Sequence, residues 1–317
     1  MKKLVSWLLA LAVVFSLTAC GAQRAETAEM NVYVLAGPTG VGAMNLWAKS
    51  DAGETENTYH FTMAGSNDEV VAAIARGEAD MAAALYQKTQ GGVTVLAVNT
   101  LGVLSLLTSG EALASAADLK GRTVYSIGQG ANPEYILRYV LCENGLDPDR
   151  DVTLRFVGDG SELMGVWQSE PDAVIMAPQP AATAMLMQYE GSRLCLDMTE
   201  EWNRVSGGES TLMMGCVIVR SAFLAEHQGA VDTFLREYAA SIEAAQSDAA
   251  ATAVLCERYG LLPKASLAEQ AIPHCGLTFV SGSAMKAQLG GYLQVMFDAN
   301  PKSVGGKLPD DGFYYGA

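Results

Sequence analysis

Neutral polar residues in loops are the groups in this chain best suited to bind a small molecule. They follow short apolar segments that are typical of β-strands, and they offer backbone N–H groups, hydroxyls and side-chain amides. Such groups suit hydrogen bonding to a polar heterocycle or an amide. The candidate ligand-binding residues are Gly37, Thr39, Gly40, Ser66, Asn67, Tyr86, Gln129, Gly130, Asn132 and Gln179, together with Glu209 and Thr211, which precede an apolar run and of which Glu209 could pair with a cationic group.

A structural role is an open alternative for several of these residues. Ser66 is followed three residues later by a glutamate, which is a capping-box pattern, so Ser66 can simply begin a helix. Tyr86 can pack in a core instead of stacking on a ligand, and Glu209 can be a solvated carboxylate instead of pairing with a cation. Trp167 and Trp202 are candidate aromatic walls of the same site, with core packing as the commoner role.

Motifs that would assemble a catalytic centre are missing from the sequence. Ser283-Ala284-Met285-Lys286 matches S-x-x-K, but the companion motifs of that enzyme class do not accompany it. The histidines His60, His227 and His274 are widely spaced, which leaves little for a histidine-built metal site. We therefore expect no catalytic residue, no metal and no cofactor.

The length and the net charge of the chain limit the kinds of protein that it can be. The chain has 317 residues and a net charge of −15, with 50% hydrophobic residues. That length allows two lobes of roughly 100–200 residues each. The acidic balance argues against nucleic acid as a partner, because phosphate binding requires a basic face.

The N-terminus is typical of a secretory signal. Lys2 and Lys3 precede an apolar run over 4–19 that is short for a membrane span. Leu17-Thr18-Ala19-Cys20-Gly21 resembles a bacterial lipobox, which implies that Cys20 is acylated, as with palmitate, and becomes the first mature residue. An ordinary signal peptide or a lone membrane anchor is the alternative. Residues 20–28 then form a tether, and the lipid is the expected link to the membrane.

The number and spacing of the cysteines that follow Cys20 favour free thiols over disulfide bonds. Five cysteines remain, an odd number without a C-x-x-C pair, and several lie in apolar runs. A bridge such as Cys256–Cys275 stays open in an extracytoplasmic setting.

Strand-like and helix-like segments alternate along the chain. Ser66 begins one predicted helix and Gly77 ends it, while Asn132 is the expected N-cap of another helix with Pro133 at its first position. A long apolar stretch over 93–107 leaves one lobe and a second over 212–219 returns to it. The alternation predicts largely parallel sheets covered by helices on both faces, with ligands beyond the carboxyl ends of the strands.

Three short motifs carry a resemblance to a known family. Asp118-Leu119-Lys120-Gly121-Arg122-Thr123-Val124, the stretch Gly145-Leu146-Asp147-Pro148-Asp149-Arg150-Asp151-Val152, and Gly77-Glu78-Ala79-Asp80-Met81-Ala82 occur in the order seen in solute-binding proteins of ABC transporters. The chain resembles the nitrate, sulfonate, taurine and thiamine-precursor type of these proteins. It departs from the family pattern at Gly128-Gln129-Gly130 and Ala177-Pro178-Gln179-Pro180.

The resemblance implies an α/β fold with two doubly wound lobes joined by a two-strand hinge, of the type II periplasmic-binding-protein kind. Lobe one is expected over 29–104 and 216–317, and lobe two over 105–215, after a signal peptide over 1–19. The implied role is that of a lipid-anchored, extracytoplasmic, monomeric substrate-binding protein that captures a small molecule for an ABC permease.

The sequence says less about the chemistry of the ligand than about the role of the protein. The candidate loops carry few cations, so we favour a neutral or aromatic heterocycle, such as a pyrimidine-like compound, over nitrate or a sulfonate. A secreted enzyme on the same fold, such as a small dehydratase, and a ligand sensor are the alternative functions.

Overall fold

A computed structural model describes residues 26–85, 92–158, 160–208 and 210–317. The predicted signal peptide over 1–19, the lipidation site Cys20, and the candidate ligand residues Tyr86 and Glu209 lie outside the described residues.

Within the described residues, six strands form the first sheet in the order β11-β4-β10-β3-β1-β2. β1 pairs in parallel with β2 and β3, whereas β10 pairs antiparallel with β3 and β4, and β11 antiparallel with β4. The strands are β1 (Glu29–Leu35), β2 (Thr58–Ala64), β3 (Met81–Leu85), β4 (Val93–Leu101), β10 (Met213–Arg220) and β11 (Leu277–Ser281).

The second sheet has five strands in the described part of the chain, in the order β7-β6-β8-β5-β9. β6 pairs in parallel with β7 and β8, and β5 pairs antiparallel with β8 and β9. The strands are β5 (Leu104–Thr108), β6 (Thr123–Ile127), β7 (Thr153–Val157), β8 (Val174–Pro178) and β9 (Arg193–Asp197).

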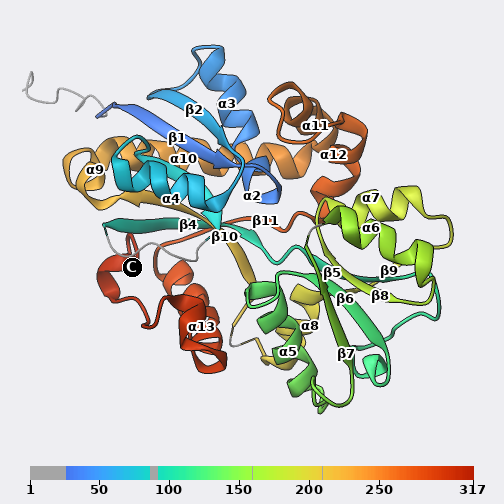
Figure 1. Ribbon diagram of the computed structural model, residues 1–317. Coiled ribbons are helices and arrows are strands. Elements are labelled where there is room, and N and C mark those ends of the chain that lie inside the picture. Colours follow the sequence, from blue (N-terminus) through green and yellow to red (C-terminus); the bar gives the residue numbers. More distant parts are fainter. Residues whose placement is uncertain (1–25, 86–91, 159, 209) are drawn as a thin grey trace, which may run out of the picture.

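The prediction of largely parallel sheets is wrong, because both sheets are mixed. The physical reason is the pair of crossings between them. β4 passes directly into β5 of the other sheet, and β10 returns from it, so these strands lack the helical crossover that a parallel neighbour needs. Figure 1 shows β4 and β10 side by side in the first sheet, with β5 beyond them in the second.

Helices cover both sheets (Figure 1). Those around the first sheet are α2 (Pro38–Val41), α3 (Met44–Asp51), α4 (Asn67–Arg76), α9 (Ser221–Glu226), α10 (Gln228–Ser247), α11 (Ala249–Arg258), α12 (Ala265–Ala271) and α13 (Gly282–Ala299). Those around the second are α5 (Asn132–Glu143), α6 (Gly160–Ser169), α7 (Ala181–Gln188) and α8 (Met198–Val205). Short 3-10 turns are η1 (Ala116–Leu119), η2 (Ile272–His274), η3 (Pro301–Val304) and η4 (Asp311–Phe313).

The first residues of α4 and α5 can be compared with the two predicted N-caps. Ser66 is the N-cap of α4, where its hydroxyl accepts the N–H of Glu69 at 3.2 Å, so that prediction is confirmed. The N-cap of α5 is Ala131 and not Asn132, so the second prediction is wrong by one residue. The Asn132 side chain instead donates from Nδ2 to the Tyr292 hydroxyl at 3.3 Å, a partner distant in the sequence.

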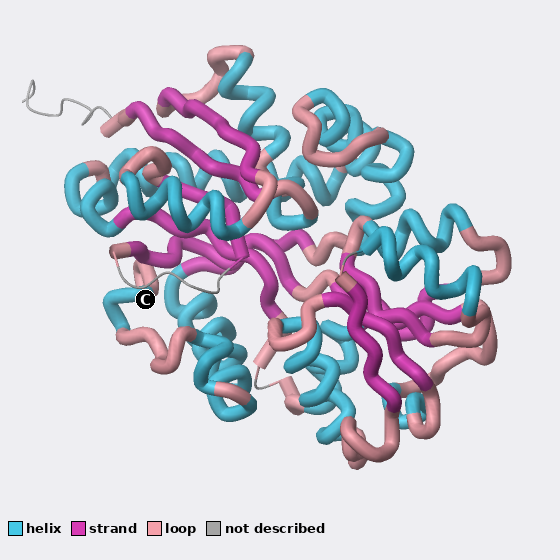
Figure 2. Tube along the Cα trace, in the orientation of Figure 1, coloured by secondary structure: helices cyan, strands magenta, loops and turns pink. Residues whose placement is uncertain are grey.

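Each sheet and the helices around it form one half of the molecule, and the two halves are also in contact outside the strand crossings (Figure 2). α13 packs beside α5, where Asn300 donates from Nδ2 to the Tyr135 hydroxyl at 2.7 Å. The ring of Trp202, on α8, lies 5.5 Å from the ring of Tyr292, on α13. On another side α12 meets α7. Residues from both halves therefore share one buried apolar cluster, and each half has a second cluster of its own.

No helix of the described residues is long and apolar enough to cross a membrane. The lipobox-like segment is not part of that finding, because it lies outside them.

Thiol labelling will test the burial of the cysteines. Burial raises the pKa of Cys216, Cys256 and Cys275 to about 12, whereas Cys142 is exposed and Cys195 partly exposed. A pKa of about 12 leaves on the order of a thousandfold less reactive thiolate at pH 8 than an ordinary cysteine has. We expect iodoacetamide and peptide mass mapping to find label on Cys142 and Cys195 in the native protein. Rapid native labelling of the other three, which should need denaturant, would contradict their burial.

Candidate functional site

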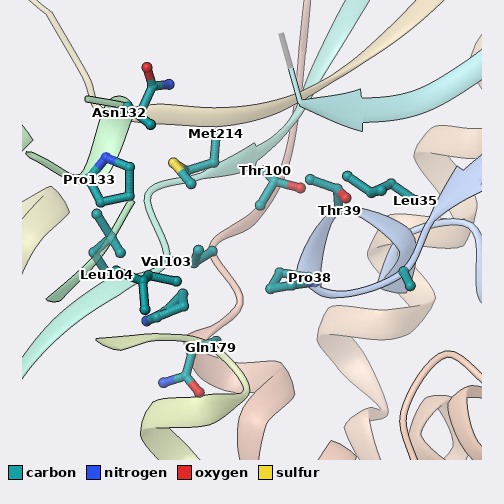
Figure 3. Close-up of a pocket in the computed structure, with 14 residues that line it drawn as sticks. Leu35, Pro38, Thr39, Thr100, Val103, Leu104, Asn132, Pro133, Gln179 and Met214 are labelled. Atoms are coloured by element: carbon teal, nitrogen blue, oxygen red, sulfur yellow. The ribbon is translucent and has the colours of Figure 1, made fainter. Parts of the chain in front are cut away.

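A cavity of about 300 Å³ lies between the two sheets (Figure 3). This is within the range of small-molecule sites. Its walls come from both halves of the molecule and from the strand crossings. The lining residues are Leu35, Ala36, Pro38, Thr39, Thr100, Val103, Leu104, Ile127, Ala131, Asn132, Pro133, Pro178, Gln179 and Met214.

Strand ends position these side chains. Leu35 ends β1, Ile127 ends β6 and Pro178 ends β8, so the carboxyl ends of strands from both sheets meet at the cavity. Val103 lies in the short link between β4 and β5. The cavity therefore occupies the crevice where α/β sheets bind ligands, as the sequence predicted.

The lining is mainly aliphatic. Among the described residues that form it, none carries a charged side chain or an aromatic ring. Trp167 and Trp202 do not form the aromatic wall considered from the sequence. Both are buried, and their indole N–H groups donate to the carbonyl of Ala173 and the hydroxyl of Ser210, each at 2.9 Å.

Thr39 is the predicted ligand residue held most firmly against the cavity. It is 3% exposed on α2, and its carbonyl accepts the Nδ2 of Asn99 at 3.0 Å. The same Nδ2 lies 2.8 Å from the Tyr238 hydroxyl, and Asn99 Oδ1 accepts the hydroxyl of Thr100 at 3.2 Å. Asn99, 1% exposed, thus fixes α2 and Thr100 together from within β4.

Asn132 and Gln179 line the cavity, but their amide groups turn away from its centre (Figure 3). The Asn132 amide faces Tyr292, as described above. Gln179, 2% exposed, uses Oε1 to accept the hydroxyl of Thr183 at 2.7 Å and the Thr183 N–H at 3.3 Å. Its Nε2 has no partner among the described residues. The Asn132 Nδ2 and the Gln179 Oε1 therefore bind neighbouring protein groups, and contact of either side chain with a ligand stays a prediction.

Four other predicted residues lie in the same loops but not in the lining. Gly40 is buried, and a Cβ there would lie 2.6 Å from the Leu35 carbonyl, so this glycine permits close packing of α2 on β1. Its N–H donates to the Gly37 carbonyl at 3.0 Å. The N–H of Gly130 is accepted by the Glu134 carboxylate at 2.7 Å. Gln129 is exposed.

The remaining candidates lie farther from the cavity lining. Ser66 caps α4, and Asn67 is the first residue of that helix; neither lines the cavity. Thr211 is half-buried just before β10 and is also outside the lining. Tyr86 and Glu209 lie outside the described residues, as does Cys20.

Sequence reasoning missed the apolar part of the site and its supporting asparagine. Thr100, Val103 and Met214 line the cavity from the strand crossings, and Met214 projects into it (Figure 3). A usable signal was present, since Asn99-Thr100 is a polar pair that directly follows the apolar run 95–98 of the strand. Buried polar groups in such a strand need partners, which marks a position of specific contacts.

The comparisons with known proteins agree with this geometry. A family model described as NMT1/THI5 like matches residues 63–251, more than half of the chain. The chain belongs to the NMT1/THI5-like family. A comparison with curated protein sequences found no match.

Solved structures show which proteins share the fold of this NMT1/THI5-like chain. An ABC transporter protein from Parabacteroides distasonis has a TM-score of 0.75 at 19% identity, covering 90% of this chain and 98% of that one. The periplasmic aliphatic sulphonate binding protein SsuA from Escherichia coli has a TM-score of 0.67 at 15% identity, covering 89% and 92%. The desulfurization enzyme DSZB has a TM-score of 0.60 at 13% identity, covering 88% and 95%. The predicted fold class and the resemblance to ABC-transporter substrate-binding proteins are confirmed.

Proposed function

We propose that this protein is a lipid-anchored, extracytoplasmic substrate-binding protein of an ABC importer, which captures a small organic solute between two lobes. The observation that supports this most directly is the cavity of about 300 Å³ bounded by strand ends of both sheets. A solute bound there contacts both halves at once. It therefore favours the arrangement in which the halves are together, which is the state a permease can recognise.

The lobe limits and the anchor belong to the same proposal. We place lobe one over 29–104 and 216–317 and lobe two over 105–215, after a cleaved leader over 1–19 and a tether over 20–28. Acylated Cys20 is the membrane link, and the protein acts as a monomer beside its permease. Of the residues predicted to meet the solute, Thr39 is the one we retain as a side-chain contact, with Asn132 and Gln179 contributing to the walls.

An enzyme on the same fold is the second candidate function, because DSZB shares the fold. The described lining favours binding over catalysis, since it holds no His, Cys, Asp, Glu, Lys, Arg or Tyr to act as an acid, a base or a nucleophile. Turnover of a bound compound, followed by NMR, would favour the enzyme. A ligand sensor would be indicated by a signalling partner in place of a permease.

Native mass spectrometry of the detergent-solubilised full chain tests capture. We expect a noncovalent small molecule in the wild-type spectrum, and readdition of the extracted molecule should raise the melting temperature. A spectrum with protein alone and no melting shift with the cell extract would overturn the proposal. Labelled palmitate tests the anchor separately: we expect incorporation in the wild type and its loss in Cys20→Ala.

A further inference from the structure

The long helix α13 joins the two halves at a place other than the strand crossings (Figure 1). Its residues pack on β4 and β11 of the first sheet, so α13 belongs to the first half. It also contacts α5, the helix that follows β6 of the second sheet. A rigid rotation of one half against the other about the strand crossings therefore changes the packing of α13 on α5.

Two asparagine–tyrosine hydrogen bonds connect these helices in a reciprocal way. Asn132, at the start of α5, donates from Nδ2 to the Tyr292 hydroxyl of α13 at 3.3 Å. Asn300, the C-cap of α13, donates from Nδ2 to the Tyr135 hydroxyl of α5 at 2.7 Å. The Asn300 Oδ1 accepts the N–H of Lys302 at 3.1 Å, which fixes the direction of this amide. Each half thus supplies one donor and one acceptor, and these directional bonds specify one arrangement of the halves.

Buried aromatic rings surround the first of these bonds. Tyr292 is 4% exposed, and its ring lies 5.5 Å from the ring of Trp202, which is fully buried on α8 of the second half. The Trp202 ring also lies 4.4 Å from that of Tyr139 on α5. Separation of the halves would expose Tyr292 and Trp202 to water, so the burial of these rings opposes separation.

The contact between α5 and α13 shares a single residue with the solute cavity. Tyr135, Tyr292, Asn300 and Trp202 do not line the cavity, whereas Asn132 does. Asn132 also lines a second, small cavity together with Tyr292. The contact is therefore made by protein groups alone, and it determines where the Asn132 wall of the solute cavity lies.

We propose that the α5–α13 contact, made by Asn132, Tyr135, Trp202, Tyr292 and Asn300, holds the two halves in the cavity-forming arrangement both with and without a solute. A solute then meets walls that are already in place, so less of its binding free energy is spent on bringing the halves together. Its release requires this contact to open, so the contact also slows dissociation. The statement about the solute rests on the proposed function, whereas the statement about the halves does not.

Paired tyrosine variants test the contact. Tyr135→Phe combined with Tyr292→Phe removes both hydrogen-bond acceptors and keeps both rings, so the apolar packing remains. We expect the loss of two hydrogen bonds to raise the ratio of separated to joined halves about tenfold. The matched control is Tyr259→Phe combined with Tyr315→Phe. It removes two hydroxyls that donate to aspartates of the first half, each at 2.7 Å.

Distances between nitroxide labels on the two halves measure this ratio. Cys142 on α5 is exposed and takes one label, Glu243→Cys on α10 provides the other, and Cys195→Ala removes the partly exposed thiol. We expect double electron–electron resonance on the detergent-solubilised full chain to give one main distance in this background and in the control. A second distance should appear when Tyr135 and Tyr292 are changed. Two comparable populations before that change, or one unaltered population after it, would overturn the proposal.

The molecule recovered from the wild-type protein by native mass spectrometry tests the consequence for binding. We expect it to dissociate about fivefold to tenfold faster from the Tyr135→Phe, Tyr292→Phe variant than from the control variant. Equal dissociation rates would reject the link between the contact and solute release.

Failure of this proposal can be separated from failure of the proposed function, because the label distances need no solute. An unaltered distance together with a recovered molecule would reject the role of the contact and leave capture standing. A second distance without any recovered molecule would support the contact and reject capture.

Discussion

Replacing Asp80 with alanine is expected to destabilise the protein by about 3 kcal/mol, the lower end for breaking a buried ion pair. Asp80 is 6% exposed, and its Oδ1 accepts the Nη2 of Arg220 at 2.7 Å. Its Oδ2 accepts the backbone N–H and the Nδ2 of Asn31 at 3.0 and 3.1 Å. The side chain thus ties β1 and β10 to the start of β3. Alanine would leave the guanidinium and two amide donors without their acceptor.

Urea unfolding of wild type and Asp80→Ala measures this loss. Glu78→Ala is the matched control, because Glu78 lies two residues away in the same motif and pairs with Arg76 at 2.6 Å on the surface. Surface pairs contribute little, so we expect the control to unfold near the wild-type urea concentration. Equal effects of the two substitutions would show that Asp80 has no special structural role.

A methyl group at Gly215 is expected to disturb both stability and solute binding. A Cβ there would lie 2.4 Å from Thr39 Cγ2, 2.7 Å from Asn99 Oδ1 and 3.0 Å from Thr100 Oγ1. Real contacts are longer, so Gly215→Ala must displace the two threonines that face the cavity or the asparagine that holds them. We expect a loss of about 1–3 kcal/mol in the free energy of unfolding from overpacking. We also expect about tenfold weaker binding of the molecule recovered from the wild-type protein by native mass spectrometry.

Two further variants identify the cause of that effect. Gly165→Ala places the same methyl group in α6 where nothing lies within 4 Å, and it should raise stability by about 0.5–1 kcal/mol through helix propensity. Adding Thr39→Ser to Gly215→Ala removes the nearest clashing atom and should recover part of the stability. A double variant no better than Gly215→Ala would place the strain elsewhere.

Asp80 and Glu134 show that a sequence motif does not by itself tell what its residues do in the structure. The Gly77–Ala82 motif supported the family resemblance, and the structure gives its aspartate a role in joining strands. Glu134 carried no weight in sequence reasoning, yet its carboxylate accepts the Gly130 N–H and pairs with Arg138 at the start of α5. The family resemblance predicted a crevice between two lobes, where the structure has its cavity, whereas the side chains of this chain form the walls of that cavity.

The sequence by itself determined the helices and strands with a clear apolar pattern, the two crossings between sheets, and loops that surround the cavity. These features depend on neighbours within a few residues, such as Ser66 and Glu69 at the start of α4, or on apolar runs long enough to be buried. Tertiary structure alone decided what the polar groups of those loops do. Asn132 meets Tyr292 and Asn99 meets Tyr238, pairs separated by 160 and 139 residues, and no local pattern reports such a partner. A buried amide binds whichever acceptor or donor the fold brings within hydrogen-bond distance, so its availability to a solute is settled only once the whole chain is packed.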